Sequence, residues 1–387
     1  MQTSKFSDLR FRSVWLYNAL QLIEERVQGL FKKSEMLPNY VTACPSCFQD
    51  QGLRLLATKV SIRIPGVCPN CKKVGERKLR LSELQYIEHT FFSWGTYQRP
   101  DYGGYPAVVS NEHQKMSVKF SDWLEPDVRL FEKWFGRGFF LYGPRFWMFG
   151  HVTPLQDLQD STKRNSVISR ILKEYPVKDV GRETLLYRVR RHPDQPDNQS
   201  EYDSPPSHLT GNGRLDTSAF PVLYASTDLE VCIHECRIAA EDDVYVATLS
   251  PTRNLKLLDL TEVLVEEGVT EFESLDLAVH MLFLAGAHSY EISRAIAESA
   301  HSAGFDGIIF PSYFSLVRTS AMPFQTTYGI SHRRIPSQRD VERAKIIPNL
   351  ALFGRPIRDG VLEVRSLNRV MINAVEYHVH FGPVSYK

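Results

Sequence analysis

The chain has 387 residues, and at roughly 100 to 200 residues per domain this length corresponds to two or three domains. A hydrophobic fraction of 43% and a charged fraction of 24% exclude a disordered or fibrous chain. The formal net charge of +1 excludes a global field that would attract nucleic acid or an anionic membrane, so only a local basic patch could do so. The first residues lack the pattern of a secretory signal, and no run of about eighteen apolar residues follows. We therefore expect a cytoplasmic protein that makes no membrane contact.

Residues 1–40 contain an amphipathic pattern. Apolar residues recur at spacings of three and four between Phe6 and Phe31, with charged residues among them. This pattern predicts one long helix. We expect the helix to pack on the rest of the N-terminal region, and a partner-binding or dimerisation helix is the alternative.

Residues 41–80 hold two Cys-x-x-Cys pairs, Cys44 with Cys47 and Cys68 with Cys71. In a reducing compartment this spacing indicates metal binding, because each pair forms a tight turn and four thiolates complete a tetrahedron around Zn2+. A site closed by four thiolates is structural rather than catalytic. With a β-prone stretch at residues 57–64 between the pairs, the sequence predicts a small zinc ribbon. Unligated thiols and redox chemistry are the alternatives.

The surroundings of the cysteines are basic. The cationic side chains are Arg54, Lys59, Arg63, Lys72, Lys73, Arg77, Lys78 and Arg80. They form either a solvated face on a metal-stapled scaffold or a surface through which the ribbon contacts nucleic acid.

Residues 81–180 form an ordered, mixed region for which the sequence predicts neither a fold nor a function. After Gly181 the chain changes to short strands and turns. We predict strands at residues 185–190, 222–226, 244–249, 255–260 and 307–310, and helices at residues 228–240 and 276–303. Strands and helices that alternate without a regular period favour an α+β fold over a doubly wound sheet.

Several short segments follow one another in this half of the chain. In order they are Leu186-Tyr-Arg-Val-Arg, Gly213-Arg-Leu, Leu223-Tyr-Ala-Ser, Cys232-Ile-His-Glu, Leu257-Leu-Asp-Leu-Thr, Gly304-Phe-Asp-Gly-Ile-Ile-Phe-Pro-Ser and Asn349-Leu-Ala-Leu-Phe. Together they resemble the RES family, which is named for its Arg, Glu and Ser and includes toxins that degrade NAD. The resemblance covers about residues 185–353, so we assign residues 181–387 to a RES catalytic domain.

This sequence departs from the compact family pattern by an insertion at residues 313–348. The insertion separates the Pro-Ser strand from the Asn-Leu-Ala-Leu-Phe segment. We expect it to cover the cleft, to alter substrate choice or to bind a partner.

The resemblance implies a split sheet like that of ADP-ribosyltransferases, with NAD as the substrate in its cleft. Cleavage of the nicotinamide–ribose bond builds positive charge on the sugar, as glycoside hydrolysis does. A fixed carboxylate near the anomeric carbon would stabilise that charge. Glu235, which lies in the matching segment, is the candidate for this role.

Four other residues are candidates for contacts with NAD. Arg214, which follows Gly211 and Gly213 and precedes a leucine, would bind the pyrophosphate or a ribose hydroxyl through its guanidinium fork and is a candidate catalytic residue. Tyr224, also a candidate catalytic residue, would offer its ring to the nicotinamide. Ser312 would bond phosphate or ribose oxygens from a strand end, and Arg188 would be a further phosphate contact.

The sequence therefore predicts an NAD glycohydrolase or phosphorylase that arrests growth as a toxin or phage-defence effector, controlled by an antitoxin or immunity protein. The first alternative is an ADP-ribosyltransferase acting on a protein or nucleic acid. The second is a zinc-ribbon binding protein with a degenerate RES domain. Front regions joined to such domains include HEPN-like ones.

Overall fold

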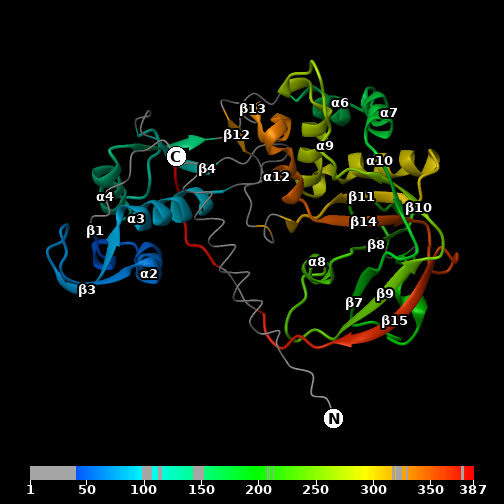
Figure 1. The fold of residues 1–387 in the computed structure, drawn as a ribbon, viewed down its shortest axis with the longest axis horizontal. Coiled ribbons are helices and arrows are strands. Elements are labelled where there is room, and N and C mark those ends of the chain that lie inside the picture. Colours follow the sequence, from blue (N-terminus) through cyan, green and yellow to red (C-terminus); the bar gives the residue numbers. More distant parts are fainter. Residues whose placement is uncertain are drawn as a thin grey trace, which may run out of the picture. The chain divides into compact units, whose positions relative to one another are not determined.

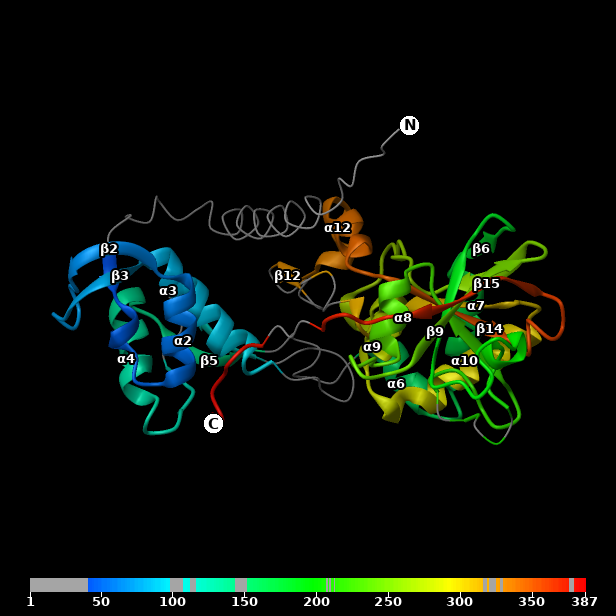
Figure 2. The same ribbon diagram turned by 90° about the horizontal axis from the view of Figure 1, so that it is seen from below.

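The computed structural model describes residues 41–97, 107–111, 116–142, 152–206, 208, 210–211, 213–315, 319, 325–327, 330–375 and 379–387. The helix predicted within residues 1–40 lies outside the described residues. The chain divides into two compact units (Figures 1 and 2). Within the described ranges, no helix combines the length and apolarity needed to cross a membrane.

The first unit is built from Met1–Gly95, Val109–Phe140 and His380–Lys387. Its elements are β1 (Val41–Ala43), η1 (Pro45–Cys47), α2 (Gln51–Val60), β2 (Ile62–Val67), β3 (Val74–Arg80), α3 (Leu81–Glu88), the π-helix η2 (His89–Trp94) and α4 (Glu125–Phe135). Strands β1, β3 and β2 form an antiparallel sheet in that order. The pair β4 (Ala107–Asn111) and β5 (Gly138–Tyr142) forms a separate two-stranded sheet.

Helix α2 corrects the strand predicted at residues 57–64. Asp50 caps the helix by accepting a hydrogen bond from the Leu53 amide at 2.9 Å, and the face with Leu53 and Ala57 is buried. The cap and the buried face hold the segment helical through Val60, and only then does β2 begin. Tertiary burial thus overrides the β-propensity of the local sequence.

Residues 380–387 complete the first unit from the other end of the chain. Lys387 exchanges two backbone hydrogen bonds with Lys119, at 2.7 and 3.0 Å. A Cβ on Gly95 would come within 2.4 Å of the Gly382 Cα, so this close backbone approach requires glycine.

The second unit contains Thr96–Val108 and Leu141–Val379. Its helices are α6 (Thr153–Gln159), α7 (Arg164–Glu174), α8 (Leu229–Glu235), α9 (Leu275–Leu284), α10 (Tyr290–Ser302) and α12 (Arg339–Ala344). Its strands are β6 (Val177–Val180), β7 (Leu186–Arg191), β8 (Val222–Ala225), β9 (Val244–Pro251), β10 (Leu255–Asp259), β11 (Gly307–Pro311), β12 (Thr326–Thr327), β13 (Ile330–Ser331), β14 (Pro348–Phe353) and β15 (Leu362–Val370). The five strands predicted after Gly181 are confirmed as β7 to β11.

Two sheets organise this unit. The larger has the order β6-β10-β11-β14-β8, in which only β10 and β11 are parallel, and the smaller has the order β15-β9-β7. A bridge between Tyr187 and Ser226 connects β7 to the end of β8. The fold is therefore mixed, with helices and two sheets, as predicted.

Figure 1 shows the larger sheet between the helices and the smaller sheet, and a hydrophobic core lies on each of its two faces. Ile308 and Phe310 of β11 face a core shared with helices α6, α7, α9 and α10, whereas Ile309 faces the core shared with the smaller sheet. This alternation follows from the two-residue period of a strand. Residues 152–180, which we had placed in the preceding mixed region, contribute to the helical core and to the larger sheet.

The single helix predicted at residues 276–303 is wrong. The segment breaks at Gly286 into α9 and α10, with a short 3-10 turn, η6 (Ala287–Ser289), between them. At the break, the Ala285 amide donates to the Met281 and Leu282 carbonyls of the last turn of α9.

Candidate active site

Glu235, at the end of α8, has a carboxylate fixed at one oxygen. Its Oε1 accepts hydrogen bonds from Ser312 Oγ at 2.6 Å and from Asn349 Nδ2 at 2.7 Å. Ser312 directly follows β11 and Asn349 lies in β14, so the pairing of these two strands brings both donors together. The residue is exposed, and no partner for Oε2 occurs among the described residues. One oxygen is thus anchored while the other is open to a ligand.

The guanidinium of Arg214 lies at the break between α9 and α10 and donates hydrogen bonds to residues on both sides of it. Nη1 donates to Leu282 O at 3.3 Å and to Ser289 Oγ at 3.5 Å, and Nη2 donates to Ala285 O at 2.8 Å. The ring of Tyr290 lies 4.9 Å from the guanidinium carbon. A cation at the carboxyl end of α9 is also favoured by the helix dipole.

Arg214 nevertheless lacks an acidic partner. Within the part of the chain that the structure describes, no carboxylate lies within ion-pair distance of it, and two of its five N–H groups remain unused. Burial lowers the pKa of Arg214, while the neighbouring Tyr290, Glu235 and Tyr224 raise it. The cation therefore lies within electrostatic reach of Glu235, and an anionic ligand would compensate its burial.

The arginine loop, which we define as residues 210–216, is held from helix α10 and from β8. Arg294 donates to Gly211 O at 2.8 Å and to Gly213 O at 2.7 Å, and Ser293 donates to Arg214 O at 2.7 Å. These bonds hold the backbone carbonyls of Gly211, Gly213 and Arg214 in place.

Tyr224 fixes the same loop through its hydroxyl. The hydroxyl donates to Asp216 Oδ1 at 2.8 Å and accepts from the Leu215 amide at 2.8 Å. Burial, with the charge of Asp216, raises the pKa of Tyr224, so the phenol stays protonated. The ring stands edge-on to Phe310 at 6.3 Å.

Arg188, in β7, is a second buried cation without an acid beside it. Nη1 donates to Tyr224 O at 2.7 Å, and Nε has no hydrogen-bond partner. Burial lowers the pKa of Arg188, and only 7% of its surface is exposed. No carboxylate pairs with it in the described ranges, which is unusual for a buried guanidinium.

Comparison with known proteins identifies this half of the chain. Residues 185–323 match the family model of the RES domain. This chain carries a RES domain. A search of curated protein sequences found no match. Among solved structures, the chain is similar to one in the crystal structure of the M. tuberculosis MbcT-MbcA toxin-antitoxin complex, with 14% identity over 53% of this chain and 92% of that chain and a TM-score of 0.29.

The structure groups the predicted site residues of the RES domain in two linked sets. Glu235 and Ser312 are in direct contact, and Arg188 contacts the backbone of Tyr224. The Ser312 hydroxyl is directed at Glu235, whereas we had expected it to contact phosphate or ribose oxygens.

Two residues at the site were not predicted. Asn349 begins the Asn-Leu-Ala-Leu-Phe segment, and its place at the start of a buried strand could have marked it. Asp216 is buried and accepts from the Gly211 amide at 2.6 Å as well as from Tyr224. Its role depends on a tyrosine in the next strand, which no local pattern reveals.

In the first unit the four cysteines lie together. The Sγ atoms are 3.8 Å apart for Cys44 and Cys47, 3.6 Å for Cys44 and Cys71, and 3.6 Å for Cys47 and Cys68. All four Sγ atoms lie within 4.8 Å of one another. A tetrahedron with Zn–S bonds of about 2.3 Å has edges of about 3.8 Å, so the four sulfurs fit zinc.

The loops around the cysteines are held by buried polar contacts. Asp127 of α4 accepts from the amides of Gln49 at 2.8 Å and Asp50 at 2.7 Å, just after the first pair. Lys78, which is buried, donates to the carbonyls of Gly66 and Gly75 in the hairpin that carries the second pair. Part of the predicted basic surface is therefore used internally.

Proposed function

We propose that the protein is an NAD-consuming enzyme that cleaves the nicotinamide–ribose bond, as a glycohydrolase or a phosphorylase. The observation that carries the proposal is the Glu235 carboxylate, held at Oε1 by Ser312 and Asn349 and open at Oε2. The RES domain supports NAD as the substrate. The two sheets joined by the Tyr187–Ser226 bridge are consistent with the split sheet of ADP-ribosyltransferase-like folds.

In this mechanism the bond between ribose C1′ and the nicotinamide nitrogen breaks, and its electron pair leaves with nicotinamide. The sugar becomes cationic in the transition state. Oε2 of Glu235 faces this charge, and its fixed position means that little reorganisation is needed during the reaction. Water or phosphate then attacks C1′ and gives ADP-ribose or its phosphorylated form.

Two buried cations would hold the charged part of NAD. Among the described residues, Arg214 and Arg188 each carry unused N–H donors and have no acidic partner. A pyrophosphate supplies the negative charge and the acceptors that both lack. Tyr224 keeps Arg214 in place through the arginine loop, and its ring is proposed to face the nicotinamide.

We further propose that Cys44, Cys47, Cys68 and Cys71 bind a structural zinc ion in a small ribbon-like module. Four thiolates leave no open coordination position, so the metal would stabilise the fold and take no part in the reaction. Salt-dependent binding of nucleic acid would test whether the exposed basic side chains of this module form a nucleic-acid surface.

An unregulated NAD-consuming enzyme would arrest the growth of its own cell. We therefore propose a toxin or phage-defence role with an antitoxin or immunity protein as the controlling partner. The partner would be recognised by its ability to restore growth and to inhibit NAD loss.

The test is incubation of the purified protein with NAD, with and without phosphate, followed by mass spectrometry. Nicotinamide and ADP-ribose indicate a hydrolase, and phosphorylated ADP-ribose that forms only with phosphate indicates a phosphorylase. Nicotinamide release only when a protein or nucleic acid acceptor is added would indicate the transferase instead. Intact NAD under all these conditions would refute the proposed function.

A further inference from the structure

The insertion at residues 313–348 is tied to helix α9 by a buried ion pair. Arg333 donates to Asp276 from Nε at 2.6 Å and from Nη2 at 2.8 Å. Only 3% of the Arg333 side chain and 1% of the Asp276 side chain are exposed. Asp276 lies in the first turn of α9 and also accepts from the Leu264 amide at 3.0 Å. This bidentate contact fixes the start of α9 in position and direction.

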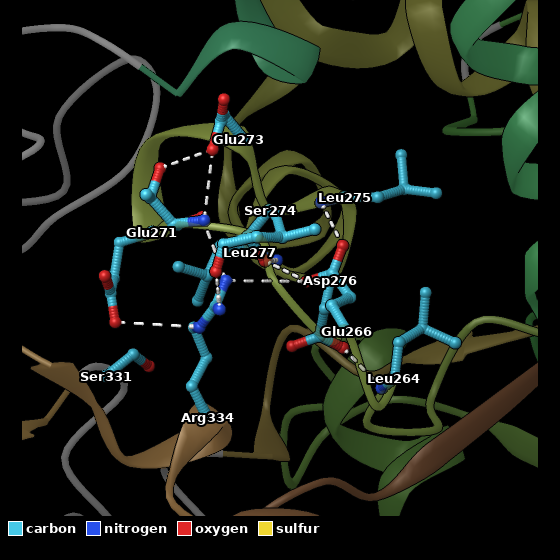
Figure 3. A network of polar contacts seen from close by, with 12 residues as sticks. Leu264, Glu266, Glu271, Glu273, Ser274, Leu275, Asp276, Leu277, Ser331 and Arg334 are labelled. Atoms are coloured by element: carbon cyan, nitrogen blue, oxygen red, sulfur yellow. Dashed lines mark hydrogen bonds and ion pairs between the residues drawn. The ribbon is translucent and has the colours of Figure 1, made fainter.

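Arg334 strengthens the same attachment (Figure 3). Its guanidinium donates to the carbonyls of Thr270 and Val269 and lies 3.6 Å from Glu271 and 4.0 Å from Glu266. Glu266 in turn accepts from the Leu275 amide at 2.7 Å and from the Ser274 hydroxyl. Two adjacent arginines of the insertion therefore anchor the N-terminal end of α9.

The opposite end of α9 holds Arg214. Leu282 O and Ala285 O, at the carboxyl end of the helix, accept from the two Nη atoms of Arg214. Helix α9 has 10 residues, nearly all buried. At 1.5 Å per residue it is a rod of about 15 Å, and a buried helix of this length transmits a shift at one end to the other.

The insertion also begins and ends beside Glu235. Ser312 directly precedes it and Asn349 directly follows it, and both donate to the Glu235 carboxylate. The insertion is thus connected to Glu235 through Ser312 and Asn349, and to Arg214 through helix α9.

We propose that Arg333 is a positioning residue for the NAD site, acting through Asp276 and helix α9 on Arg214. The inference rests on the proposed function, because Arg214 is the proposed phosphate-binding residue. A buried ion pair adds little net stability compared with an apolar pair of the same size. Its bidentate geometry instead defines where α9, and hence the carbonyls that hold Arg214, must lie.

The test replaces both charges at once. Arg333→Met combined with Asp276→Asn leaves no unpaired buried charge and keeps an acceptor for the Leu264 amide. Arg343→Met is the matched control, because Arg343 lies in the same insertion and pairs with Glu262 at 3.0 Å on the surface. Both variants are made in the Glu235→Gln background, and NAD binding is measured by calorimetry without turnover.

A positioning role predicts that the dissociation constant for NAD rises about tenfold in the double variant while the stoichiometry stays at that of the parent. Arg333→Lys alone should recover part of the loss. A merely structural role predicts a lower stoichiometry with an unchanged dissociation constant, and that result overturns the proposal.

Hydrogen exchange gives a second measurement that does not depend on the ligand. The double variant should exchange the amides of Gly211 and Leu215 faster than the parent, and Arg343→Met should not. If the native protein leaves NAD intact, the proposed function is refuted, but the exchange result still decides the coupling. Unchanged exchange in the arginine loop would contradict it.

Discussion

Replacing Glu235 by Gln removes the charge at the candidate site while keeping its hydrogen bonds. The glutamine oxygen can accept from Ser312 and Asn349 as Oε1 does, at 2.6 and 2.7 Å in the native protein. The amide nitrogen then stands where Oε2 faces the ligand. We expect the stability to change by less than about 1 kcal/mol, because the donors keep an acceptor.

The kinetic effect follows from Coulomb's law. Two unit charges about 4 Å apart interact by about 4 kcal/mol at an effective dielectric constant near 20, which suits an exposed carboxylate. The sugar carries part of a unit charge in the transition state, so we take about 3 kcal/mol. This corresponds to a loss of about 100-fold in kcat.

The assay is nicotinamide release over a range of NAD concentrations, with thermal unfolding of each variant as the check on folding. Glu230→Gln is the control, since Glu230 lies in the first turn of the same helix. A Glu235→Gln protein with kcat within threefold of the native value would refute electrostatic stabilisation by this carboxylate.

Four further substitutions test other residues of the two units. Ser312→Ala removes one hydrogen-bond donor to the Glu235 carboxylate and should lower kcat by about tenfold in the native protein. In the Glu235→Gln background the same change should leave kcat unaltered, and a double-mutant cycle of the rates would show this difference. Cys68→Ser should reduce the bound zinc measured by elemental analysis and lower the unfolding temperature of the first unit, and a metal-free native protein of unchanged stability would contradict this. Arg294→Met frees the carbonyls of the arginine loop and should raise KM for NAD with a smaller change in kcat, and equal KM values would exclude this support role. Burial lowers the pKa of His332, so the folded insertion binds a proton more weakly than the unfolded chain does. The folded state therefore loses stability as the pH falls below 6.5. Urea unfolding between pH 7 and 5 should show this slope, and His332→Gln should flatten it.

The sequence predicted the strands of the RES domain because their apolar runs are short, β-branched and bounded by turns. It also predicted the spacing that brings the cysteines together, since ligand spacing is a local property. Helix α2 was not predicted, because the capping carboxylate of Asp50 and a buried face decide its structure. The break at Gly286 was not predicted either, because it depends on hydrogen bonds from Arg214 to carbonyls at the end of α9.

The sequence indicated candidate site residues but not the contacts among them. Motif order pointed to Glu235, Arg214, Tyr224 and Ser312, but not to the hydrogen bond between Ser312 and Glu235. That bond joins residues 77 positions apart, and it exists because β11 ends beside the last turn of α8. Periodicity contains no information about such distant pairs.

The path of the chain through the first unit has a consequence for synthesis. Residues 380–387 contribute the backbone partner of Lys119 and the glycine that packs on Gly95, yet the ribosome makes them after the whole RES domain. The cysteine-containing unit therefore cannot reach its final structure until the second unit has left the ribosome. A chain that stops before residue 380 would contain a finished RES domain and an unfinished first unit. Removal of residues 380–387 should therefore expose the first unit to proteolysis while sparing the second.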